Sequence, residues 1–192
     1  RTRQFQTQVF AFGLALMVQV GFLSHHVPIA VPWLGESGAA VAVTAAAVAA
    51  FGGRLLLARY ADRVDVRKTA AGVLAFGAVS LVGMALFPSP TAMMALSISY
   101  GLTVGNITTL PPIITRREFG AASFGVVFGV AAMLSSVLMA LGPSLFGGIR
   151  QLMGGYAPAL LLGAALDVLA VAALIWGGRK PLVPPALAPS SR

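Results

Sequence analysis

The amino-acid sequence predicts an all-α integral membrane protein in which six transmembrane helices form one bundle. Its 192 residues are 58% hydrophobic and only 9% charged, and the mean hydropathy is +0.90. The apolar residues gather in six runs, each close to the roughly 20 residues that a helix needs to cross a bilayer core. Apolar residues within each run are continuous rather than alternating, which favours helices over the strands of a membrane barrel.

The six predicted spans follow one another through short links. In order, they cover residues 8–30, 38–57, 69–87, 92–114, 124–146 and 157–176. PWLGES and PSP are typical of the links, and such short connections make neighbouring helices antiparallel. We assign residues 1–176 to one six-helix domain. The segment 177–192 is rich in proline and poor in helix formers, so we expect a disordered cytoplasmic tail.

Each span carries residues that mark where it bends, ends or packs. Pro28 and Pro32 are expected to kink or end the first span, and Pro111 and Pro112 the fourth. The second span ends in the basic loop RYADRVDVRK and the third at PSP. GLTVG in the fourth span and GVVFG in the fifth each place two glycines on one helix face, which permits close packing in lipid. The sixth span, ALLLGAALDVLAVAALIW, is a continuous apolar run with one aspartate.

Lysine and arginine are distributed unevenly between the two sides of this predicted bundle. One side collects Arg1, Arg3, Arg59, Arg63, Arg67, Lys68, Arg116, Arg117, Arg179, Lys180 and Arg192. The other side collects only Arg150. Because cytoplasmic loops carry the excess of positive charge, both termini are predicted to be cytoplasmic, in a bacterial inner membrane. The first run lacks a signal-peptide cleavage pattern, and since the chain begins at Arg1 we expect its start to be missing.

Composition and motifs exclude several classes of function. The net charge of +8 comes from basic residues that punctuate apolar runs, whereas a nucleic-acid binder clusters them on a polar face. The sequence has no cysteine, which excludes disulfides, thiolate metal sites and cysteine nucleophiles. It contains no HExxH, GxSxG or nucleotide-binding glycine loop. We therefore predict neither an enzyme nor an ATP-driven pump, and neither a metal nor a cofactor.

Arg54 is the most informative residue, because it lies inside the second apolar span. An arginine at the centre of a lipid-spanning helix costs roughly 2.5 to 3.5 kcal/mol, so it normally faces a partner, a cavity or an anionic ligand. A guanidinium holds a carboxylate through two parallel hydrogen bonds and stays charged. Snorkelling is the alternative, since Arg59 is near and a bent Arg54 side chain could reach the membrane surface.

The loop after this span contains Asp62, Arg63, Arg67 and Lys68. A carboxylate beyond a helix end can accept hydrogen bonds from free N–H groups at a neighbouring helix N-terminus, where the helix dipole favours negative charge. The adjacent arginines can then reach carbonyl groups at the C-termini of helices. Such a loop can latch helix bundles together in one conformation. In the alternative interpretation the loop is solvated, and its arginines only set the topology.

The string ARYADRVDVRK resembles the loop motif of the major facilitator superfamily, in its second six-helix half. The acidic and basic residues just named match the motif, whereas Ala58 and Asp65 stand where it usually has glycine. GNITTLPPIITRREFG, FGVVFG, GPSLFGG and GGYAPALLL are similar to the last three helices of oxalate/formate-antiporter-like and monocarboxylate-porter-like members. The resemblance covers essentially the whole chain.

This resemblance implies a secondary transporter of two six-helix bundles, which alternate access to a substrate held between them. In its carboxylate-transporting members an arginine of the second helix in this half binds the anion, and Arg54 occupies that place. Dicarboxylate carriers are expected to have a second cation in the fifth helix, which residues 124–146 lack, so we expect a monocarboxylate. The partners are then an anionic substrate, the lipid bilayer, and an N-terminal six-helix half, missing or separate, or a second copy.

Five more polar residues inside the spans are candidate site residues. Asn106 and Gln19 could line the cavity or form bonds between helices. His25 and His26 lie near the outer end of the first span, where they either couple protons or have a structural role. Asp167, in the last span, is a candidate for proton coupling, and a structural, hydrogen-bonded aspartate is the alternative.

The alternative function is a non-transporting six-helix membrane scaffold or sensor component, or a truncated remnant. Half of a transporter forms only half of a substrate cavity, which is the main argument for that alternative. A transport assay separates the two hypotheses.

Overall fold

The computed structural model describes residues 2–177, without the side chains of Thr2 and Asp62. The helices are α1 (Thr2–Tyr60), the short 3₁₀ helix η1 (Ala61–Arg63), α2 (Val66–Leu86), α3 (Pro90–Phe119), α4 (Phe124–Ala140), α5 (Gly142–Met153) and α6 (Ala157–Gly177). These described residues contain no strand, as the sequence predicts for an all-α protein. The expected disordered tail lies outside the described residues, except that Gly177 belongs to α6.

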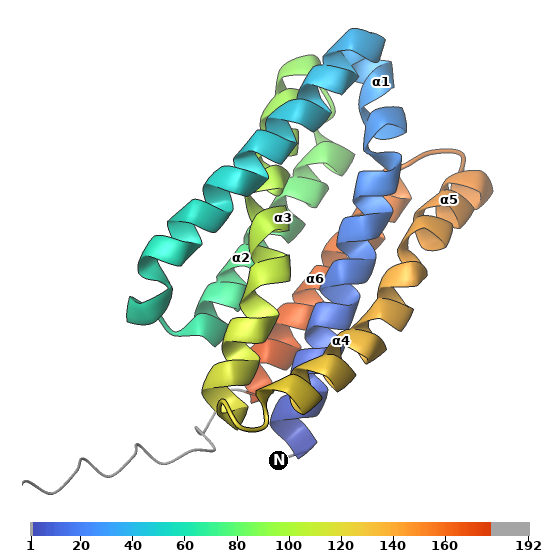
Figure 1. Ribbon diagram of the computed structural model, residues 1–192. Helices are drawn as coiled ribbons and strands as arrows, with labels where there is room; N and C mark the ends of the chain where they lie inside the picture. The colour runs from blue at the N-terminus through green and yellow to red at the C-terminus, as the bar shows by residue number, and fades with distance from the viewer. Residues whose placement is uncertain (1, 178–192) are drawn as a thin grey trace, which may run out of the picture.

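Helix α1 has 59 residues and makes two passes along the bundle, because it doubles back at Gly35 (Figure 1). Gly35 has φ 68° and ψ 175°, a conformation that glycine adopts without strain, and open space surrounds it. Pro28 and Pro32 lie inside the helix and do not end it. The first two predicted spans are thus two helical arms that meet at the non-helical Gly35, and we call them the first arm (residues 2–34) and the second arm (residues 36–60).

The fifth predicted span, in contrast, is divided into α4 and α5. At the division, the Leu141 N–H bonds to the Leu138 carbonyl oxygen at 3.1 Å. Pro143 lies in the first turn of α5, where its missing N–H leaves no helical hydrogen bond unmade, so the residue suits a helix start at this point. Taken together, Phe124–Met153 still qualifies as one candidate membrane span.

Four helical stretches among the described residues are long and apolar enough to cross a membrane. They are Arg3–Tyr60, Val66–Leu86, Phe124–Met153 and Ala157–Gly177. The described helices therefore do not correspond individually to the six predicted transmembrane helices. Helix α3 falls outside this set, since it carries asparagine and several threonines along its length and three charged residues at its end. The described helices nevertheless indicate a multi-pass membrane protein.

The first arm of α1 lies in the middle of the bundle. Helices α3, α4, α5 and α6 all pack against α1, while α2 packs against α6 and α3 (Figure 1). Two apolar clusters fill the interior. Leu74 and Ile114 belong to the cluster nearer the N-terminus of the chain, and Phe22 and Phe146 to the cluster nearer the bend of α1. Every predicted element thus contributes to one helical bundle.

The two glycine pairs that we expected to pack helices behave differently. Gly101 and Gly105 of α3 lie against the second arm of α1, where an added Cβ atom would collide with the carbonyl oxygens of Ala46 and Ala50. The two glycines of GVVFG in α4 have nothing within 4 Å of such an atom. The packing prediction is confirmed for the first pair and is wrong for the second within the described chain.

Candidate functional site

Arg54 lies on the second arm of α1, and its side chain crosses onto α3. Its Nε donates a hydrogen bond to the carbonyl oxygen of Gly105 at 3.1 Å, and its Nη2 donates to Thr108 Oγ1 at 3.0 Å. The residue is exposed, and no acidic side chain among the described residues pairs with it. Its guanidinium therefore keeps further N–H groups and an uncompensated positive charge.

Glycine at position 105 explains how this arginine reaches α3. A Cβ atom there would lie 2.8 Å from Arg54 Cγ, so any larger residue would displace the arginine side chain. The Gly105 carbonyl oxygen also accepts from Thr108 Oγ1 at 3.1 Å and from Thr109 Oγ1 at 2.8 Å. Sequence reasoning selected Arg54 but did not anticipate Thr108, which follows Asn106 by two residues in the same glycine- and threonine-rich stretch.

A groove of about 150 Å³ lies beside this contact, between the first arm of α1, α3 and α4. Its lining consists of Gln8, Phe12, Leu16, Ile107, Thr108, Pro111, Phe128, Ala131, Ala132, Ser135 and Ser136. Thr108 belongs to both the groove and the Arg54 contact. The groove is thus mainly apolar, with a few hydroxyl and amide groups, and has an arginine next to one wall.

Gln8 is a polar lining residue that sequence reasoning missed. Its Nε2 donates to Thr115 Oγ1 at 2.7 Å and to the Pro111 carbonyl oxygen at 3.1 Å. Its Oε1 is buried and has no hydrogen-bond partner among the described residues. Gln8 is a polar residue in the first apolar run, as Gln19 is, so the same criterion that selected Gln19 could have selected Gln8.

Asn106 and Gln19 are both buried, but neither lines the groove. Asn106 Nδ2 donates to the carbonyl oxygen of Leu102 in its own helix at 3.0 Å. The same nitrogen lies 3.3 Å from where Gly53 would carry a Cβ atom, so Asn106 faces the contact between α1 and α3. The Oε1 of Gln19 and the Oδ1 of Asn106 have no hydrogen-bond partner among the described residues.

In the predicted latch loop, Arg67 is the residue with the most partners. Its guanidinium forms an ion pair with Glu118 of α3, through Nε to Oε1 and through Nη2 to Oε2 at 2.8 Å. It also donates to the Leu174 carbonyl oxygen of α6 at 3.2 Å and to the Gln4 carbonyl oxygen of α1 at 3.1 Å. One buried arginine therefore ties four helices together at this end. Sequence reasoning did not anticipate Glu118, the only acidic residue in RREF.

The other residues of the loop contribute less to this network. Asp65 caps α2: its Oδ1 accepts from the backbone N–H groups of Arg67 at 3.1 Å and Lys68 at 3.2 Å. Arg63 and the Lys68 side chain are exposed and have no side-chain partner among the described residues. The Asp62 side chain lies outside the described residues, so its predicted contact is not tested.

The two adjacent histidines face different neighbours. His25 Nε2 donates to the Pro143 carbonyl oxygen at 3.1 Å, because a carbonyl can only accept, and His25 Nδ1 lies 2.9 Å from the Tyr156 hydroxyl oxygen. His26 is buried, and its Nε2 lies 2.9 Å from Ser97 Oγ in α3. Both histidines therefore connect the first arm of α1 to other helices near the bend.

Asp167 of α6 is buried inside the bundle. Its Oδ2 lies 3.7 Å from the position of a Cβ atom on Gly77, and Tyr100 Cε2 lies 3.6 Å from the same point, so the two side chains converge there. Neither Asp167 Oδ1 nor the Tyr100 hydroxyl has a hydrogen-bond partner among the described residues. The hydrogen bond that the structural alternative assumed for Asp167 is thus not observed at Oδ1.

Comparisons with known proteins give a likeness of fold. No family model matches the chain, and no curated protein matches it. The crystal structure of a bacterial homologue of the human lysosomal transporter Spinster, inward-facing and unoccupied, resembles it with a TM-score of 0.56 at 16% sequence identity. This likeness shows that the chain shares a helical fold with part of that protein. At 16% identity the likeness extends to the fold alone.

The match covers 91% of this chain and 46% of the Spinster homologue, so the chain spans about half of that transporter's length. The groove beside Arg54 and the Arg67 network both lie in this one helical bundle. At the Arg54 contact, a positive charge that has no acidic partner lies next to a groove. This contact is therefore the best candidate for a binding site among the described residues.

Proposed function

We propose that this chain is one helical bundle of a secondary transporter for a small organic anion, and that Arg54 contacts the anion. The two arms of α1, then α2, α3, the α4–α5 pair and α6 would make six membrane passes. Both termini would be cytoplasmic, in a bacterial inner membrane, following the distribution of basic residues. The Spinster homologue, which is about twice as long, supports a transporter in which this bundle is one part.

The charge of Arg54 is the observation that carries this proposal. Inside a membrane protein, an arginine without a carboxylate partner is retained where it faces a cavity or an anionic ligand. Arg54 is anchored by two neutral oxygens, which orient its guanidinium without neutralising it. A carboxylate arriving from the groove side would form charge-assisted hydrogen bonds with the remaining N–H groups.

A monocarboxylate is the substrate class that we favour. Within the membrane-spanning part, α4 has no basic residue, and the only one in α5 is Arg150, in its last turn. One cation next to the groove matches one negative charge, and a dicarboxylate would leave its second charge desolvated at considerable cost. Asn106 and Gln19 are buried in this conformation, and would supply further polar contacts in a conformation in which their helices separate.

Transport then requires a partner bundle and alternating access. An N-terminal six-helix half, on the same polypeptide or a separate one, or a second copy of this chain would complete the cavity. Asp62, Arg63, Arg67 and Lys68 would stabilise one of the alternating conformations. Asp167, His25 and His26 would be the groups available for proton coupling.

Uptake of radiolabelled formate, lactate and oxalate into proteoliposomes that contain the natural gene product tests this proposal. We expect saturable uptake of a monocarboxylate that Arg54→Lys and Arg54→Ala abolish, while both variants still insert in the membrane. The matched control is Arg59→Lys, because Arg59 is exposed at the end of the same helix and has no side-chain partner among the described residues. Unchanged uptake in the Arg54 variants would remove this residue from the mechanism, and no uptake of any anion would favour the scaffold or sensor alternative.

A further inference from the structure

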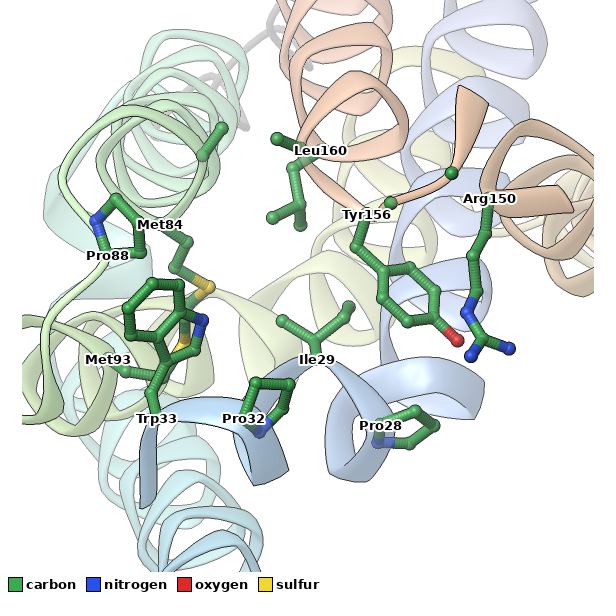
Figure 2. Close-up of a pocket in the computed structure, with 14 residues that line it drawn as sticks. Pro28, Ile29, Pro32, Trp33, Met84, Pro88, Met93, Arg150, Tyr156 and Leu160 are labelled. Carbon is green, nitrogen blue, oxygen red and sulfur yellow. The ribbon is translucent and has the colours of Figure 1, made fainter. Parts of the chain in front are cut away.

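A second, larger pocket lies at the opposite end of the bundle from the N-terminus, under the bend of α1. It has a volume of about 360 Å³ and is enclosed by α1, α2, α3, the end of α5 and the start of α6 (Figure 2). It shares no lining residue with the groove beside Arg54. Its size falls within the range of small-molecule sites, which is roughly 300 to 1,000 Å³.

The walls of this pocket are almost entirely apolar. Ile29, Met84, Met93 and Leu160 are buried residues of four different helices and form its inner part. Pro28, Pro32 and Trp33 are exposed and Pro88 is half-buried, so these four lining residues, labelled in Figure 2, form the outer part of the pocket. The pocket therefore suits an apolar chain that enters from the end of the bundle.

One edge of the pocket carries a positive charge held in place by other residues. Arg150 and Tyr156 lie side by side there (Figure 2), with the guanidinium carbon 5.1 Å from the centre of the tyrosine ring. The Tyr156 hydroxyl is fixed by His25, which is itself bonded to Pro143 of α5. A cation over an aromatic face is stabilised there, and its N–H edge stays available to an anion.

No acidic side chain of the described residues forms an ion pair with Arg150. Glu36, the other charged residue near the bend, is exposed on the second arm of α1 and does not line the pocket. Arg150 is also the only charged residue in the lining. The pocket thus combines apolar walls with a single cation at its edge.

We propose that this pocket binds an amphipathic anion, with its apolar chain between the helices and its anionic head on Arg150. A free fatty-acid-like carboxylate and a phospholipid with an anionic headgroup share this chemistry. The site is independent of the proposed transport function, because it lies on different residues from the Arg54 groove. Its occupation would hold α1, α5 and α6 together at the bend.

The two tryptophans of the chain allow a direct measurement, since Trp33 lines the pocket and Trp176 lies in the last turn of α6. The variant Trp176→Phe leaves Trp33 as the only tryptophan. In phosphatidylcholine nanodiscs, we expect saturable quenching of Trp33 by ω-bromoundecanoate, reversed by unbrominated undecanoate. The uncharged ω-bromoundecanol should bind roughly three- to tenfold more weakly, because it lacks the ionic hydrogen bond to Arg150. The converse variant, Trp33→Phe, should show no saturable quenching.

Substitutions then test the two parts of the site. Arg150→Gln should remove the preference for the carboxylate over the alcohol, whereas Arg116→Gln, an exposed arginine at the other end of the bundle, should preserve it. Gly155→Leu should weaken both ligands, because a side chain at this lining position would enter open space and occupy the pocket. The melting temperature of each variant reports whether the fold is intact.

Brominated phosphatidylglycerol in the nanodisc distinguishes the two sources of the anion. If this lipid quenches Trp33 more strongly than brominated phosphatidylcholine does, and the difference disappears in Arg150→Gln, the ligand is a phospholipid. Quenching by the free carboxylate alone identifies a fatty-acid-like ligand. Equal affinities for the carboxylate and the alcohol, or an unchanged preference in a folded Arg150→Gln variant, would overturn the proposal. None of these outcomes depends on whether the chain transports an anion.

Discussion

Two regions of this bundle contain an arginine packed against α3, and the two arginines have opposite surroundings. Arg67 is buried and bound on all sides, with the carboxylate of Glu118 and two backbone carbonyl oxygens as acceptors. Arg54 is exposed and bonds only to one carbonyl oxygen and one hydroxyl. The charge of the first is neutralised within the chain, and that of the second is not.

This difference teaches how to separate a structural arginine from a binding one in a membrane protein. A cation that meets its own carboxylate has no charge left for a ligand, and removing either partner leaves the other buried and unpaired. A cation held by neutral oxygens is oriented but still attracts anions. We therefore expect substitutions near Arg67 to affect stability and substitutions of Arg54 to affect binding.

The largest effect is expected for Arg67→Ala. It leaves the Glu118 carboxylate mostly buried without its partner, which costs about 3 to 5 kcal/mol in comparable buried pairs. The free energy of unfolding, measured by titration with dodecyl sulfate in mixed micelles, should fall by that order. The double variant Arg67→Met, Glu118→Leu removes both charges and should recover part of the loss. A single variant as stable as the natural chain would mean that this ion pair does not hold the four helices.

A smaller loss is expected for Gly105→Ala, in the region of Arg54. The new methyl group would collide with the Ala50 carbonyl oxygen and press on the Arg54 side chain, and overpacking of this kind costs about 1 to 3 kcal/mol. Gly129→Ala is the matched control, since open space surrounds Gly129 in α4 and the change should be neutral or slightly stabilising. The same titration measures both. Equal effects would contradict the difference between the two glycine pairs.

Asp65→Ala should cost about 1 kcal/mol, the usual value for loss of an N-terminal helix cap. The substitution removes the oxygen that accepts from the N–H groups of Arg67 and Lys68, so it loosens the start of α2 next to the ion pair. Asp65→Ser should retain most of the stability, because serine caps as well as aspartate. Thermal melting followed by tryptophan fluorescence measures the difference. A serine variant as unstable as the alanine variant would show that the charge matters more than the cap.

The smallest effect on stability is expected for Arg54→Lys. Two hydrogen bonds of an exposed side chain are lost, and water or lipid headgroups can replace them, so the free energy of unfolding should change by less than about 1 kcal/mol. Anion binding should nevertheless be lost, because lysine cannot hold a carboxylate in two parallel bonds. Calorimetric titration with formate, alongside the unfolding measurement, checks both. A loss of stability as large as that of Arg67→Ala would remove the distinction between the two regions.

The sequence predicted the helices better than their boundaries. Continuous apolar runs identify helical spans, but they do not show that the first two spans would meet at the single non-helical residue Gly35. The proline at position 143 was visible inside the fifth span, and we extended the span through it because its neighbours are apolar. Helix ends depend on single backbone groups, and apolar composition does not report on those.

For the candidate site, residue type identified the arginines but not their partners. A charged residue in an apolar run is conspicuous by itself and identified Arg54, whereas the charged loop motif identified Arg67. Thr108 and Glu118 lie more than fifty residues away from them in the chain, and a threonine or a loop glutamate is unremarkable until the helices pack. Asp65 was read as a departure from a glycine position, whereas its side chain caps α2.

The sequence by itself determined that this chain is helical, belongs in a membrane and carries a cation where lipid would be expected, because these properties follow from composition and local order along the chain. Only the tertiary structure decided which arginine is neutralised, which glycine pair packs and where the openings lie. Those outcomes depend on which helix faces pack against each other, and this packing places side by side residues that are far apart in the chain and share no local sequence pattern.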